Sequence, residues 1–415
     1  MRKFDVVITV NSPGELSALV RPTVEKLAET HPEIRIILVV TPCQYASGRE
    51  LEVARKFKGI SEIILPEEYK RWIWQGKAPQ GIKFGEEGLV LFMGGDLLHA
   101  VLLSKKLRYK ALAYTERLQW IKNFNRFLVP DKLTYDRFLK KVPKEKVRLV
   151  GNLMVDGINL KFGKEEAKVK WELSKSPIIT LMPGSRFFQI KYMTAFFVRV
   201  AELITEECAD AQFLLNLSPY VTLDKIEKAI NPHLKDNWTH DRQMGTSGFI
   251  NYEGDKKYIV SQQGVRVQLI ENSNYEAMNV SDLILTIPGT NTAEIAALGI
   301  PMVVVFPLNK PEIFPLEGLL GILSELPLLG KLIKRGVVSF RNRSTKYFAL
   351  PNMKAQAEIT PEVRGQLKAS DVAEVTMALL KDENRRKAIG RKLKEIMGER
   401  GAVGKIIYEI ISAGT

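Results

Sequence analysis

Leu181-Met-Pro-Gly-Ser-Arg186 and Ile287-Pro-Gly-Thr-Asn-Thr-Ala-Glu294 are two glycine turns on which the interpretation of this chain depends. Each follows an apolar run, Pro177 to Met182 or Leu283 to Ile287, that is typical of a buried strand, and each opens a helical pattern. Because ligands of parallel sheets bind at the carboxyl ends of the strands, the pair predicts a binding edge in an α/β fold.

The residue types in these turns suit the diphosphate and ribose of a nucleotide sugar. Gly184 and Gly289 allow the backbone to approach an anion, and the helix that follows each turn offers free amides. Glu294 carries two acceptor oxygens for vicinal ribose hydroxyls. Either turn alone also fits a plain strand-to-helix connection without a ligand. We expect the side chains that bind the pyrophosphate to be Ser185, Arg186, Thr290, Asn291 and Thr292.

Composition restricts the class of protein. A length of 415 residues predicts two domains, and 45% hydrophobic with 26% charged residues is typical of a globular protein. The two cysteines, Cys43 and Cys208, lie far apart without metal-ligand spacing, which favours a reducing cytoplasm and predicts neither a disulfide framework nor a metal site. The net charge of +14 indicates an anionic partner, either a membrane surface or a phosphorylated substrate, since no nucleic-acid motif accompanies it.

Strands alternate with helical spacers in both halves of the chain, which predicts two Rossmann-like domains facing a cleft. We expect an N-terminal acceptor-side domain over residues 1–160 and a nucleotide-sugar domain over 161–370. The second contains an apolar insertion near 313–335, and C-terminal helices follow over 371–415.

The chain resembles the lipid-A-disaccharide synthases, inverting glycosyltransferases of the GT-B architecture. The resemblance runs in order along most of the sequence. The matching segments are Gly14-Glu15 with Ser17, Phe92 to Asp96, Val150 to Asp156, Leu181 to Arg186, Pro288 to Glu294, Pro301-Met-Val-Val and Leu350-Pro-Asn352. The resemblance implies transfer of a sugar from a UDP-sugar to a lipid or glycolipid acceptor, with no cofactor, and it places Asn352 near the donor.

The sequence departs from the family's motifs in the two loops that the resemblance places near the acceptor. Ala18-Leu19 stands where the family has Gly-Asp, and His99 replaces the second aspartate of the loop at Asp96. The donor side of the resemblance is therefore better supported, and the acceptor need not be a lipid A precursor.

An inverting transfer needs a base near the acceptor hydroxyl. Asp96, Glu15 and His99 are the candidates, and Asp96 and His99 could share a helical face and relay a proton. Each has a structural alternative: Asp96 as a helix N-cap, Glu15 as a first-turn carboxylate, and His99 as a packed side chain. Asn352 could likewise be only a turn residue.

The insertion combines leucine, isoleucine, glycine and proline with a basic flank, which favours peripheral contact with an anionic membrane on its cytoplasmic face. Trp72 and Trp74 could form a second contact of this kind. The alternative is packing between domains or in a homodimer. Two other function classes stay open: a nucleotide-sugar epimerase of the same fold, and a relative that has lost catalysis.

Overall fold

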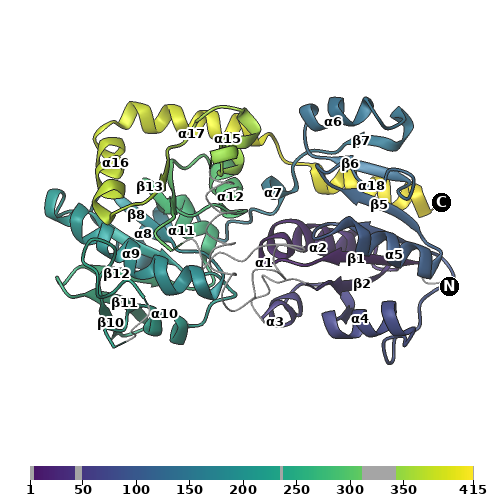
Figure 1. Ribbon diagram of the computed structural model, residues 1–415, viewed down its shortest axis with the longest axis horizontal. Coiled ribbons are helices and arrows are strands. Elements are labelled where there is room, and N and C mark those ends of the chain that lie inside the picture. The colour runs from purple at the N-terminus through teal and green to yellow at the C-terminus, as the bar shows by residue number, and fades with distance from the viewer. Residues whose placement is uncertain (1–3, 43–48, 234–236, 311–342, 415) are drawn as a thin grey trace. The chain divides into compact units, whose positions relative to one another are not determined.

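The computed structural model describes residues 4–42, 49–233, 237–310 and 343–414. The chain forms two compact units, Met1–Ile158 with Gly398–Thr415, and Asn159–Met397. The C-terminal helices, expected as one segment over 371–415, divide between them. Helices α16 (Ala369–Lys381) and α17 (Glu383–Met397) pack in the second unit, whereas α18 (Ala402–Gly414) packs in the first (Figure 1).

The first unit is built on a seven-stranded sheet in the order β3-β2-β1-β4-β5-β6-β7, in which every pair of neighbours is parallel. Strand β1 is buried along its whole length and β4 along all but its first residue, as their valine, isoleucine and leucine content dictates. The strands are β1 (Asp5–Val10), β2 (Arg35–Val40), β3 (Ile60–Ile64), β4 (Gly88–Phe92), β5 (Lys110–Tyr114), β6 (Arg126–Val129) and β7 (Val147–Leu149).

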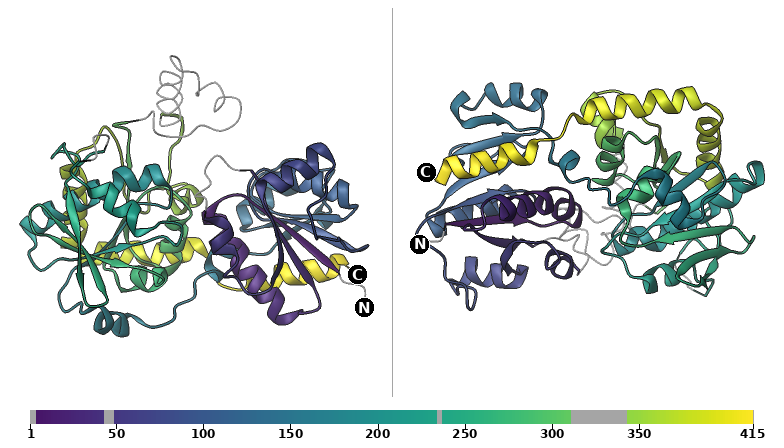
Figure 2. Two further views of the ribbon diagram at one scale, coloured as in Figure 1. Left: turned by 90° about the horizontal axis from the view of Figure 1, so that it is seen from below. Right: turned by 180° about the vertical axis from the view of Figure 1, so that it is seen from behind.

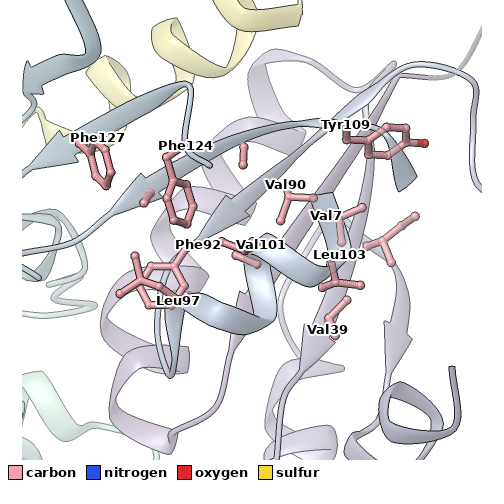
Figure 3. Close-up of a cluster of buried hydrophobic side chains, with 14 of the residues drawn as sticks. Val7, Val39, Val90, Phe92, Leu97, Val101, Leu103, Tyr109, Phe124 and Phe127 are labelled. Atoms are coloured by element: carbon pink, nitrogen blue, oxygen red, sulfur yellow. The ribbon is translucent and has the colours of Figure 1, made fainter. Parts of the chain in front are cut away.

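Three helices close one face of this sheet over a continuous apolar core, part of which is shown in Figure 3. Val7 of β1 lies level with Ile37 of β2 and Val90 of β4, and all three belong to this core together with Leu97 and Val101. The covering helices are α4 (Pro66–Gln75), α5 (Leu97–Leu107) and α6 (Lys132–Leu139).

The remaining elements of this unit are short apart from α2 (Arg21–Thr30), which contacts α18. They are α1 (Pro13–Glu15), a π-helical turn η1 (Leu16–Val20), α3 (Glu50–Ala54), a 3₁₀ turn η2 (Lys144–Lys146) and α7 (Leu153–Asp156). Buried Glu409 ties α18 to the sheet through Arg126 of β6 and Arg148 of β7. Figure 2 shows α18 running along the first unit.

The second unit has an eight-stranded sheet in the order β10-β11-β12-β9-β8-β13-β14-β15. The pairs from β12 to β15 are parallel, whereas β10 and β11 form an antiparallel hairpin at one edge. The strands are β8 (Ile178–Met182), β9 (Gln212–Asn216), β10 (Gly248–Glu253), β11 (Lys256–Ser261), β12 (Arg266–Ile270), β13 (Leu283–Thr286), β14 (Met302–Pro307) and β15 (Glu362–Gly365).

Helices pack against both faces of this sheet (Figures 1 and 2). Long α9 (Phe187–Glu207) contacts α10 (Leu223–Ile230) and α16, whereas α8 (Lys164–Trp171) contacts α11 (Asn274–Val280). Further along the chain, α12 (Asn291–Leu298) contacts both α15 (Leu350–Ala355) and α17. The predicted fold class, with two Rossmann-like α/β sheets, is confirmed, although the second sheet ends in an antiparallel edge.

Two expectations about apolar surfaces have different outcomes. Trp72 is only 4% exposed and stacks on Phe84 with 4.8 Å between ring centroids, so the prediction that it contacts a membrane is wrong. Trp74, two residues on, is 74% exposed because the helical repeat turns it away from the core. The apolar insertion at 313–335 lies outside the described residues.

Candidate functional site

The two glycine turns lie side by side at the carboxyl edge of the second sheet. Strands β8 and β13 are hydrogen-bonded neighbours, with Met182 level with Thr286. Gly184 has a φ of +111°, and a Cβ at that position would lie 2.7 Å from Cδ1 of Ile287. Only glycine fits this backbone and this spacing, so the turns predicted separately from the sequence form one edge.

The first turn begins α9 with Arg186 at the N-cap position. The amides of Ser185 and Arg186 donate to Oε1 of Gln189 at 3.2 and 3.1 Å. These two donors are therefore occupied by the side chain of Gln189, at the start of a helix whose N-terminus favours an anion. The sequence pattern with glutamine three residues after the cap could have revealed this bond.

In the second turn, Gly289 is exposed and Thr290 and Asn291 are half-buried. The side-chain amide nitrogen (Nδ2) of Asn291 donates to the hydroxyl of Thr286 at the end of β13. Thr292 is fully buried, and its hydroxyl donates to the Gly289 carbonyl at 2.8 Å and accepts the Leu350 amide at 3.1 Å. Thr292 thus joins α12 to α15, and its hydroxyl proton is engaged with the Gly289 carbonyl, so it is not available to a phosphate of a nucleotide sugar.

Glu294 is half-buried in the first turn of α12 and accepts a hydrogen bond from Tyr275. The distance between the Tyr275 hydroxyl and Oε1 of Glu294 is 2.7 Å. Tyr275 lies in α11, which follows β12, and nothing in the sequence pattern assigned it to Glu294. The bond fixes the orientation of one carboxylate oxygen.

Asn352 is fully buried beside β15. Its amide nitrogen donates to the Thr360 carbonyl and to Glu362, and its oxygen accepts the amides of Ile359 and Thr360. All of its hydrogen-bonding capacity is used within the protein. Asn352 therefore has a structural role, but it lies within helix α15 and not in a turn, which was the expected alternative to contact with the nucleotide sugar.

In the first unit, Glu15 joins the loops after β1 and β4. Its carboxylate accepts the Ser12 hydroxyl at 2.8 Å and also the Gly95 amide. A Cβ on Gly94 would collide with this carboxylate. Burial raises the pKa of Glu15, against the opposing effects of Ser12, Gly95 and the Arg117 guanidinium.

Arg117 was not identified from the sequence. It follows β5 and donates to the Gly95 carbonyl at 3.1 Å. The ends of β1, β4 and β5, which are neighbours in the sheet, therefore share a hydrogen-bonded group at their carboxyl edge.

Asp96 caps α5: its Oδ1 accepts the Leu98 amide at 2.8 Å, and its side chain is exposed. Asp96 is therefore an N-cap residue, as the structural alternative predicted. The cap uses one carboxylate oxygen and leaves the other available for chemistry. His99 is half-buried one turn on, and its Nδ1 lies 2.7 Å from the hydroxyl of Tyr69. Burial lowers the pKa of His99, opposed by the charge of Asp96.

The described residues contain no group of three or more histidine, cysteine, aspartate or glutamate side chains placed to hold a metal ion. None of their helices is long and apolar enough to cross a membrane.

The architecture is that of GT-B enzymes. The chain superposes on UDP-GlcNAc 2-epimerase from Neisseria meningitidis with a TM-score of 0.56 and 14% identity, over 99% of this chain and 100% of that one. It superposes on CalG4, the calicheamicin glycosyltransferase, with a TM-score of 0.51 and 11% identity, over 100% and 98%. These likenesses confirm the fold class.

The sequence is similar to the lipid-A-disaccharide synthases, the family that its motifs predicted. The family model for lipid-A-disaccharide synthetase matches residues 135–244 and 250–319. Lipid-A-disaccharide synthase of Syntrophus aciditrophicus is 24% identical over 260 residues, which are 62% of this chain and 54% of that protein. The enzyme of Pseudomonas putida KT2440 is 25% identical over 234 residues, 56% and 48%. The matched part spans about half the length of these relatives.

Proposed function

We propose that this protein is an inverting glycosyltransferase that moves a sugar from a UDP-sugar to a lipid or lipid-linked acceptor. The observation that carries the proposal is the edge formed by the two glycine turns on neighbouring strands β8 and β13. Glu294 lies one turn into the adjoining helix with one oxygen fixed by Tyr275. Amides at a helix start suit a diphosphate, and a fixed carboxylate suits a ribose diol.

On the donor side, Arg186 and the N-terminus of α9 would neutralise the leaving diphosphate, together with Thr290 and Asn291 from the neighbouring turn. Glu294 would bind the ribose. Thr292 and Asn352 have their polar atoms engaged inside the protein, so we assign them to supporting the site rather than to contacting the donor.

On the acceptor side, Asp96 is the preferred candidate base because its carboxylate is accessible to an acceptor. Its side chain is exposed, and one hydrogen bond to the Leu98 amide orients it. Glu15 is held by Ser12 and the Gly95 amide beneath the same loop. We therefore assign Glu15 to positioning the loop and Asp96 to taking the acceptor proton.

A peripheral membrane location, on the cytoplasmic face, accompanies the lipid acceptor in this proposal. Its support is the sequence of residues 313–335, with about a dozen large aliphatic side chains, and the net charge of +14. Vesicles of anionic lipid should sediment the protein, and high salt should release part of it. Replacing Leu319, Leu320 and Leu323 by serine should abolish sedimentation. Equal sedimentation of that variant would refute the membrane role of the segment.

Donor consumption tests the reaction class. Purified protein is incubated with UDP-glucose or UDP-N-acetylglucosamine, with and without a bacterial lipid extract, and UDP release and sugar identity are followed. A transferase releases UDP only when the extract is added. Epimerisation of the sugar without extract would establish the epimerase alternative, and no consumption together with UDP binding would indicate a relative without catalysis.

A further inference from the structure

Tyr69 and His99 form a contact to which the proposed reaction assigns no role. Tyr69 comes from α4 and is 1% exposed, whereas His99 lies in the first turn of α5. Their rings meet edge to face at 87° with centroids 5.1 Å apart, and the hydroxyl lies 2.7 Å from Nδ1. The imidazole is therefore held by both packing and a short hydrogen bond.

The direction of this hydrogen bond follows from burial. Burial, together with the charge of Asp96, raises the pKa of Tyr69, so its hydroxyl keeps its proton. Among the described residues, His99 is the partner of that hydroxyl. A buried O–H that only accepted would leave its proton unpaired, which is unfavourable away from water. Tyr69 therefore donates, and Nδ1 of His99 accepts.

The tautomer of His99 then follows. Burial lowers its pKa, which favours the neutral ring, although Asp96 on the same turn opposes this. A neutral imidazole whose Nδ1 accepts carries its proton on Nε2. Within the described part of the chain, Nε2 has no partner, and it is not among the fully buried unpaired atoms, which are the hydroxyls of Thr9 and Thr194. The Nε2–H group therefore reaches solvent.

We propose that Tyr69 fixes His99 as a hydrogen-bond donor, whose Nε2–H binds an oxygen of the acceptor beside the Asp96 carboxylate. This assignment rests on the proposed function. His99 is then a substrate-binding residue and Tyr69 a positioning residue. Because the accessible nitrogen already carries a proton, His99 does not serve as the base, and the proton relay between Asp96 and His99 considered from the sequence is replaced by separate roles.

Nitrogen-15 NMR of histidine-labelled protein tests the tautomer directly, since the chain has only 4 histidines and H99Q identifies the resonance. We expect Nε2 to be protonated and Nδ1 to be an unprotonated acceptor near neutral pH. Y69F should move the Nδ1 resonance toward that of a nitrogen without a hydrogen bond. Y135F removes a hydroxyl from a ring packed on the same core and should leave the resonance unchanged. A proton on Nδ1, or no change in Y69F, would overturn the inference.

Kinetics test the role. H99Q keeps an N–H donor and should retain transfer within about tenfold, with the wild-type pH profile, whereas H99L should raise the acceptor KM by about tenfold or more. A loss of a hundredfold or more in kcat for H99Q would identify His99 as the base and refute the proposal. UDP binding should be equal in all these variants. If wild type failed to bind UDP, the proposed function would fail, whereas the NMR result would still decide the tautomer.

Discussion

Replacing Asp96 by asparagine separates its two roles, because the structure assigns one to each carboxylate oxygen. Oδ1 accepts the Leu98 amide at 2.8 Å, and an asparagine oxygen accepts it equally well. The free energy of unfolding of D96N should therefore lie within about 0.5 kcal/mol of the wild-type value. D96A loses the cap, and its free energy of unfolding should fall by about 1 kcal/mol.

The second oxygen of Asp96 is the proposed proton acceptor, and an amide cannot replace it. Removing a general base costs about 10² to 10⁴ in rate, which corresponds to about 2.7 to 5.4 kcal/mol of transition-state stabilisation. The assay is UDP release in the presence of lipid extract, with urea unfolding and UDP binding as controls. If D96N folds, binds UDP and turns over within threefold of wild type, Asp96 is only a cap and Glu15 becomes the candidate base.

Three further predictions concern the donor site, pH dependence and stability. UDP should raise the melting temperature of wild type, and R186A should lose most of that shift; equal shifts in both proteins would refute the role of Arg186 at the diphosphate. The pKa of Glu15 is raised above its usual 4.5, so its contribution to folding is complete below that value and declines as pH rises through the folded-state pKa. Urea unfolding of E15Q between pH 4 and 8 should therefore show the variant gaining stability relative to wild type as pH rises, then levelling off; a difference that does not vary with pH contradicts this. Asp5 is fully buried, and its two oxygens accept Nε and a terminal nitrogen of Arg35 at 2.8 and 2.7 Å, so D5A should lose about 3–5 kcal/mol of unfolding free energy. The exposed Glu29, paired with a lysine three residues away, provides the matched control: E29A should change it by less than about 0.5 kcal/mol, and similar values for the two variants would refute the argument from burial.

Much of the proposed donor-binding edge of the second sheet could be predicted, because residues adjacent in the sequence determine it. An apolar run followed by Pro-Gly specifies a buried strand and a tight turn, and Gly184 adopts a conformation that other residues rarely adopt. Alternating strands and helices imply parallel pairing, and parallel pairing brings strand ends to one edge. Strand, turn and edge thus follow from residues adjacent in the sequence.

The assignment of individual side chains could not be predicted in the same way. Thr292 and Asn352 have the polarity of ligand-binding residues, but α15 and β15 pack beside them and take up their hydrogen bonds. Side-chain type does not reveal whether a polar group faces a ligand or the protein, because burial depends on elements that are distant in sequence.

By itself, the sequence determined two α/β domains, the pair of glycine turns and the resemblance to lipid-A-disaccharide synthases. Only the tertiary structure decided which groups meet. Tyr69 reaches His99 because helices α4 and α5 cover the same face of the first sheet, and Tyr275 reaches Glu294 across helices that follow different strands. These pairs are separated by 30 and 19 residues. Local periodicity specifies which face of an element is apolar, whereas strand order and packing determine which elements become neighbours.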